Sequence, residues 1–452
     1  MIKHYIFIIL YIIGYNALPS EALLVLLIIH GLIGIYTDVA SRSISLLTLI
    51  YMAMILGSFA NIELILKINS GEHTIYDYIA IPYIREATLI WCIGNAAIIM
   101  GYEFFRKKSL PPISVEINEK YLRGIFVFIT ILNLSSLAGK TINFNFLGGG
   151  GVKAIGLLNL ISILIFARLW KKKNNTRYRT YALSLFVIQT YIALTTSYLR
   201  QELLYPGLSL MGGYFLGLGN IKYLFTYRII PALIGLSFFI YVFKDLQRSH
   251  FIDIFYNNTT QNTNDDPIDE EDAKLDEGKG TFLDRIASLA QITCCVKLVT
   301  NNGLYYGTAS APLVIAVIPR FLWPDKPQIR LGAWFATAIG TAYIDENGVI
   351  NNSVNMTIPG ELYLDFGWVG IIIGCILFGG LLALFWNAAN FTSSPYNVTG
   401  MMWGGYLLQA GLGGYAAGDL QLVITFFSTY LIFYLIKLMF RPKKIAVKTL
   451  EN

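Results

Sequence analysis

Long apolar runs separated by short polar segments dominate the chain. The runs are long enough to cross about 30 Å of hydrocarbon, a few of them only if tilted or flanked by polar anchors. They predict about twelve membrane-spanning helices, near residues 4–18, 20–37, 44–66, 86–105, 122–138, 154–170, 180–198, 203–219, 228–243, 367–387, 398–416 and 420–440. The first two runs are the weakest and could instead form one hairpin or a partly re-entrant pair. The pattern predicts an all-α polytopic membrane protein.

Basic residues are unevenly distributed between alternate loops. If the amino terminus is cytoplasmic, the loops on that side contain most of them, including the clusters at 106–108 and 168–179 and the tail after 440. The short loops on the other side keep only Lys67, Arg85, Lys140, Lys153 and Arg200. Since short cytoplasmic loops collect Lys and Arg, both termini are predicted to be cytoplasmic and residues 244–366 to lie outside.

This organisation divides the chain into four parts. Residues 1–243 contain spans one to nine, 244–366 form a large external loop, 367–440 contain the last three spans, and 441–452 form a cytoplasmic tail. Within the loop, 257–280 is acidic and almost free of apolar residues, so we expect a disordered tether. Apolar residues at helical spacing predict an amphipathic helix over 282–300, at the interface or packed on the bundle.

The loop then becomes basic and rich in proline, over residues 312–330. Three prolines within nine residues rule out a regular helix and favour a rigid, turned segment. Arg320, Lys326 and Arg330 on such a segment suit a fixed anion-binding surface, because Arg offers a planar fork and Lys a compact charge. The alternative is a basic loop that lies on anionic lipid headgroups.

Two carboxylates close the loop. Glu361 and Asp365 are four residues apart and would share one helix face at the membrane boundary. Burial and mutual repulsion there would tune one of them as a general base or acid, and Glu361, nearer the loop, is the better candidate. The alternative is a pair of acidic residues that favour the positive end of a helix dipole.

A further cation, Arg200, lies in the tight turn between the seventh and eighth spans. Its partner would be either Glu202 or the phosphate of a bound lipid. Small residues at four-residue spacing, Gly213 and Gly217 in the eighth span and Gly370 and Gly374 in the tenth, predict close helix packing. Packing of these two spans on each other would bring Arg200 towards the loop.

Composition narrows the possible chemistry. The 452 residues are 55% hydrophobic and only 14% charged, which excludes an ordinary soluble domain. The net charge of +6 is spread among loops and indicates orientation rather than nucleic-acid binding. The four cysteines and four histidines have no metal-ligand spacing, and no nucleotide-binding or hydrolase motif occurs, so we expect no metal and no cofactor.

Two short motifs carry a family resemblance. Ile318-Pro319-x-x-Leu322-Trp323-Pro324-x-Lys326-Pro327, followed by Pro359-Gly360-Glu361-x-Tyr363-x-x-Phe366-Gly367, resembles the Wzy-type oligosaccharide repeat-unit polymerases, which include O-antigen, common-antigen and capsule or exopolysaccharide polymerases. The motif match covers about 20 residues, whereas the topology match covers nearly the whole chain. The resemblance implies a GT-C-like membrane glycosyltransferase of the bacterial inner membrane with a large periplasmic loop.

The resemblance also implies a reaction and a set of roles. Such enzymes transfer a glycan from undecaprenyl pyrophosphate onto a new lipid-linked repeat unit, without a metal, beside a flippase and a chain-length regulator. Glu361 or Asp365 would be the general base, and cations would stabilise the leaving pyrophosphate. Sugar or lipid would contact Trp323, Tyr363 and Phe321, although the aromatic belts of membrane proteins explain most interfacial Trp and Tyr residues equally well. The residues implied to bind pyrophosphate are Arg320, Lys326, Arg200 and Arg330.

Two other functions are compatible with this pattern. An O-antigen-ligase-like glycosyltransferase shares the pyrophosphate chemistry but would be expected to carry an external catalytic histidine. His250 is the main candidate and His73 a poorer one, and neither lies in the basic segment. A flippase or transporter of lipid-linked oligosaccharides would be expected to show internal repeats and charges in mid-span. Few such charges and no clear repeat are present, which favours the polymerase.

Overall fold

The computed structural model describes residues 2–40, 46–72, 78–113, 119–137, 148–196, 200–218, 286–307, 323, 331–342 and 353–389, with eight positions between 426 and 438. Every regular element in these ranges is helical. Four helical stretches there are long and apolar enough to cross a membrane, namely Ser20–Asp38, Leu46–Ser70, Ile81–Phe105 and Ile358–Ala388. The predicted class, a helical membrane protein, is therefore confirmed.

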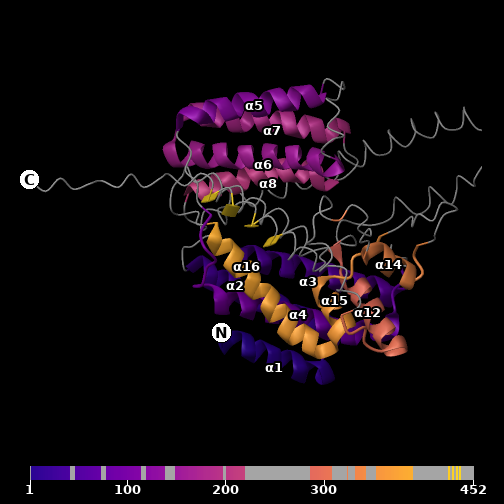
Figure 1. Cartoon of the computed structure of the whole chain (residues 1–452). Helices are drawn as coiled ribbons and strands as arrows, with labels where there is room; N and C mark the ends of the chain where they lie inside the picture. Colours follow the sequence, from indigo (N-terminus) through magenta and orange to yellow (C-terminus); the bar gives the residue numbers. More distant parts are fainter. Residues whose placement is uncertain are drawn as a thin grey trace, which may run out of the picture.

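Helix α4 (Ile84–Phe105) is the centre of the first group of helices (Figure 1). Every residue from Ala87 to Tyr102 is buried, as expected for a helix that is apolar all round and surrounded by others. A short 3₁₀ turn, η1 (Ile81–Tyr83), leads into it. Its neighbours include α1 (Ile2–Ala17), α2 (Ser20–Ala40), α3 (Leu46–Ser70) and α16 (Cys375–Ala388).

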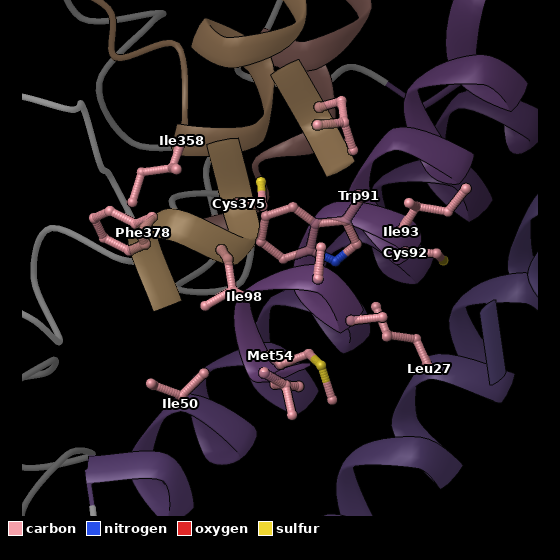
Figure 2. Close-up of a cluster of buried hydrophobic side chains, with 14 of the residues drawn as sticks. Leu27, Ile50, Met54, Trp91, Cys92, Ile93, Ile98, Ile358, Cys375 and Phe378 are labelled. Atoms are coloured by element: carbon pink, nitrogen blue, oxygen red, sulfur yellow. The ribbon is translucent and has the colours of Figure 1, made fainter. Parts of the chain in front are cut away.

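Helices α4 and α16 touch backbone to backbone. A Cβ atom added at Gly101 would lie 1.9 Å from the carbonyl oxygen of Ile376, and one at Gly379 would lie 1.9 Å from that of Ile98. Only glycine permits this approach. Figure 2 shows the resulting cluster, in which Trp91 of α4 lies beside Cys375 of α16.

The tenth predicted span, 367–387, is the second arm of a helical hairpin. Helix α15 (Ile358–Val369) has a break at Gly367, where φ is 60°, and a π-helical turn (Gly370–Gly374) leads into α16. A Cβ atom at Gly370 would lie 2.1 Å from the carbonyl oxygen of Leu362, so the chain folds back on itself. The apolar stretch 358–388 is therefore two arms, and the first arm carries both predicted carboxylates.

A second group consists of α5 (Glu119–Leu137), α6 (Gly148–Lys173), α7 (Thr176–Thr196) and α8 (Arg200–Leu218) (Figure 1). A Cβ atom at Gly213 would lie 2.2 Å from the carbonyl oxygen of Leu164 in α6, so α8 uses its glycines to pack on α6. Gly370 and Gly374 instead face Leu362. The prediction that the eighth span packs closely on another helix is confirmed, and that helix is α6. The glycines do not pack the eighth span on the tenth, because each set already meets a neighbour nearer in sequence.

The amphipathic helix predicted over 282–300 corresponds in part to α12 (Leu289–Asn302), which starts later than predicted and packs on the bundle. The Asn61 side chain of α3 fixes its start, since its Oδ1 accepts hydrogen bonds from the backbone N–H groups of Ser288 and Leu289, both at 3.0 Å. Thr293 accepts a hydrogen bond from the N–H of Ala80 beside η1. Helix α12 ends at Gly303, whose φ of 79° suits glycine. A short helix, α14 (Leu331–Ala338), lies nearby (Figure 1).

Candidate functional site

Glu361 and Asp365 lie one turn apart on the first arm of the hairpin, and both side chains are fully buried. The sequence Thr357-Ile358-Pro359 starts this helix: proline suits the first turn, where no N–H partner is needed. A buried carboxylate is costly unless other groups compensate for its charge, so two of them on one short helix mark a candidate site.

The helix begins at a strained residue. Thr357 has φ 65° and ψ 153°, a conformation that costs a β-branched residue about 1–3 kcal/mol. Its Oγ1 accepts a hydrogen bond from the N–H of Gly360 at 3.1 Å, and its carbonyl accepts one from the N–H of Glu361 at 2.9 Å. The strained residue therefore holds the turn from which the Glu361 side chain projects.

The other end of the helix is held by the turn that follows α12. The N–H groups of Tyr305 and Tyr306 donate to the carbonyls of Leu364 and Asp365, at 3.1 and 2.9 Å. These bonds satisfy carbonyls that the break at Gly367 would leave open. Because both ends are pinned, the helix holds its carboxylates in one fixed arrangement.

Helix α12 forms one wall of the site with two buried thiols. Cys294 donates from Sγ to the carbonyl of Tyr78 at 3.2 Å. Burial raises the pKa of the Cys295 thiol well above its ordinary value, and Cys294 and Glu361 add to the effect. The thiols therefore stay protonated, which makes them packing groups rather than nucleophiles.

Tyr363, predicted to contact sugar or lipid, is mostly buried and already has a partner. Its hydroxyl donates to Oε1 of Glu86 at 2.6 Å, and its ring meets that of Trp368 edge-on at 5.8 Å. This bond ties the hairpin to the first turn of α4. Sequence reasoning missed Glu86, although a carboxylate just inside an apolar span is the signal that could have revealed it.

The structure brings Glu361, Tyr363 and Asp365 together on one helix. Within the basic segment 312–330, the structure describes Trp323 alone, and this residue is 38% accessible to solvent. Arg200 is the first residue of α8, and its side chain is outside the described part of the molecule. The remaining predicted residues also lie outside the described ranges, namely Arg320, Phe321, Lys326 and Arg330.

Within the described residues, no group of three or more His, Cys, Asp or Glu side chains is arranged to hold a metal ion. A second polar cluster does exist, at the far end of α4, where His4, Tyr11, His30 and Glu103 meet. Sequence reasoning missed it as well. The available signal was the seven-residue spacing of His4 and Tyr11, which places both on one face of the first helix.

Comparison with protein families gives one match. A family model described as a domain of unknown function (DUF8712) matches residues 10–448, nearly the whole chain. Neither the curated proteins nor the solved structures contain a match to this chain.

Proposed function

The chain belongs to the DUF8712 family, and we propose that it polymerises lipid-linked oligosaccharide repeat units. In this reaction a glycan moves from undecaprenyl pyrophosphate to a hydroxyl of the terminal sugar on a new lipid-linked unit. Undecaprenyl pyrophosphate leaves, and the hydroxyl loses its proton. The proposal is supported by the resemblance to Wzy-type polymerases and by the chemistry of the hairpin.

The observation that carries the proposal is the placement of Glu361. It is fully buried on a helix pinned at both ends, and Asp365 follows one turn later. A rigidly held carboxylate can accept the proton of a positioned hydroxyl, a role that contributes about 10²–10⁴-fold to the rate of a reaction. We assign this role to Glu361 first and to Asp365 second.

The leaving group needs positive charge. In the proposal Arg320, Lys326 and Arg200 stabilise the developing pyrophosphate, with Arg330 in a lesser role because it lies outside the motif. Trp323, Phe321 and Tyr363 line the sugar or lipid entrance. For Tyr363 this requires its hydroxyl to exchange Glu86 for substrate, or its ring face alone to make the contact.

The proposal includes a topology. About twelve spans of GT-C-like arrangement cross the bacterial inner membrane, with both termini cytoplasmic and the loop of residues 244–366 in the periplasm. This face is where undecaprenyl-linked units would meet the enzyme, a flippase and a chain-length regulator. Neither a metal nor a cofactor takes part in the proposed step.

A glycan ladder tests the proposal. In cells that depend on this gene for polysaccharide, Glu361→Gln and Arg320→Ala should each reduce long chains to single repeats, a loss of at least about 100-fold. The matched control is Arg177→Ala, since Arg177 is an exposed cation of α7 in a predicted cytoplasmic loop. An unchanged ladder in both test variants, with normal membrane insertion, would exclude this site assignment.

A further inference from the structure

Helices α5 and α7 each carry a row of apolar side chains that the rest of the protein leaves uncovered. In α5 the row consists of Val127 and Ile131, and in α7 it consists of Leu183, Val187 and Tyr191. All five side chains are between 39% and 62% exposed. Each row has the four-residue spacing that places side chains on one face of a helix. Contiguous apolar surface of this kind marks contact with a membrane or a partner.

An arginine stands at the same end of both rows. Arg123 and Arg179 each precede the first apolar residue of their row by four positions, and both are exposed. Helices α5 and α7 lie side by side (Figure 1), and Phe126 of α5 stacks on Tyr181 of α7 at 4.1 Å. Arg123 comes three residues before Phe126, and Arg179 comes two residues before Tyr181. Both cations therefore lie within one helical turn of this contact, at one end of the helix pair.

The charge at this end of the second group is positive. Lys172 in the last turn of α6 and Arg177 in the first turn of α7 add two exposed cations there. None of the side chains that the structure describes in α5–α8 is acidic, and the side chain of Glu119, the first residue of α5, is outside the described part. The amino-terminal ends of α5 and α7 also carry the positive end of the helix dipole, which favours anions. An anion from outside the protein would therefore be stabilised here.

We propose that the outer surface of α5 and α7 is a binding site for anionic phospholipid. The acyl chains lie along the two apolar rows, and Arg123 and Arg179 hold the phosphate of the headgroup at their common end. A guanidinium group suits this role because its planar fork of N–H donors matches the oxygens of a phosphate. Clusters of Lys and Arg beside membrane helices bind anionic lipids of the cytoplasmic leaflet, and this end of the helices is predicted to be cytoplasmic.

A comparison with the hairpin shows what is particular to the α5–α7 surface. The hairpin also exposes an apolar row, since Val369, Ile373 and Leu377 follow the same spacing and are all exposed. However, residues 353–389 include no Lys or Arg, so any lipid can cover this row. The rows of α5 and α7 end at cations, which select a negative headgroup. A second copy of this chain on the same surface would bring like charges together, which opposes association.

Native mass spectrometry of the full chain in detergent tests the proposal, because it counts bound lipids and measures their affinity. The probes are phosphatidylglycerol, which is anionic, and phosphatidylcholine, which has no net charge. The unaltered chain should bind phosphatidylglycerol more tightly. In the double variant Arg123→Gln and Arg179→Gln, the affinity for phosphatidylglycerol should fall by about 25-fold, since each cation near a headgroup contributes about fivefold.

Arg177→Gln is the matched control. It removes the same charge from the same helix, but the four-residue spacing places Arg177 in line with Tyr181 and the buried Leu185, on the side that faces the core. Its affinity for phosphatidylglycerol should therefore stay within about twofold of the unaltered chain. Because all three arginines are exposed, these variants should fold normally. Inorganic phosphate, which has no acyl chains, should not displace the bound lipid.

Several results would overturn the proposal. Equal affinity for the two lipids would mean that the rows meet bulk lipid only, and an unchanged preference in the double variant would place the anionic lipid elsewhere. An equal loss in Arg177→Gln would mean diffuse charge rather than a site, and displacement by inorganic phosphate would mean a site for free phosphate. A dimer that Val187→Arg dissociates would assign this surface to a second copy of the chain. The proposal is independent of glycosyl transfer, so these measurements alone decide it.

Discussion

The two groups of helices differ in what they bury. The first group, around α4, encloses charged and polar side chains that include His4, His30, Asp38, Glu361 and Asp365. The core of the second group, α5–α8, is mostly aliphatic and aromatic, with Phe126 stacked on Tyr181 at 4.1 Å, and among its described residues it buries a single charged side chain, Arg168 of α6. Burial of ionisable groups is expensive within a membrane and occurs where a protein has a use for it. Among the described residues, we therefore place most of the proposed chemistry in the first group, with Arg200 at the start of α8 as the contribution of the second.

The sharpest test of this comparison asks whether the two ends of the first group face opposite sides of the membrane. Lys107 is exposed near the end of α4, and Asn301 is exposed at the end of α12. Because the four native cysteines are buried, their background labelling should be low. An impermeant maleimide added to intact cells should label Asn301→Cys and leave Lys107→Cys unlabelled. Equal labelling of the Asn301→Cys and Lys107→Cys variants would contradict the proposed topology.

The next largest effect is expected at the backbone contact between α4 and α16. In Gly101→Ala the new methyl group would meet the carbonyl of Ile376, which cannot move without separating the helices. We expect a loss of about 3 kcal/mol or more in the free energy of unfolding. Gly124→Ala in α5, which meets nothing within 4 Å, is the control. Thermal unfolding in detergent measures the stability of both variants. A small loss of stability in Gly101→Ala would mean that α4 and α16 are less tightly packed than the structure shows.

A neighbouring pair of glycines in α8 tests the second group in the same way. Gly213→Ala would meet the carbonyl of Leu164 and should destabilise by about 1–3 kcal/mol. Gly212→Ala has open space and should stabilise by up to about 1 kcal/mol, because alanine favours a helix. Denaturant midpoints of the two variants should therefore move in opposite directions. Movement in the same direction would contradict the packing of α8 on α6.

The smallest effect concerns Thr357, which both caps and strains the carboxylate helix. Thr357→Ala removes the cap and keeps the unfavourable φ, so we expect a loss of about 1 kcal/mol. Thr357→Gly also removes the cap but relieves the left-handed conformation, so its loss should be smaller. Thr357→Ser keeps the cap and serves as the control. Unfolding midpoints in the order Ser, Gly, Ala would support this account, and Gly below Ala would refute it.

Local pattern was a good guide to the helices and a poor one to their partners. Apolar runs predict helices because burial of a hydrophobic face is a property of consecutive residues. The pairing of α8 with α6 depends on which surfaces meet, and four-residue glycine spacing states only that some helix comes close. The same limit applies to Tyr363, whose partner Glu86 is 277 residues away in the chain.

The sequence by itself determined that this chain is a helical membrane protein and that Glu361 and Asp365 share a helix. Hydropathy and i,i+4 spacing are sufficient for both. Tertiary structure alone decided that this helix folds back at Gly367 and is pinned by Thr357 and the turn after α12. It also decided that His4, His30 and Glu103 meet, because residues from three helices form one hydrogen-bonded chain only when those helices pack in a particular register.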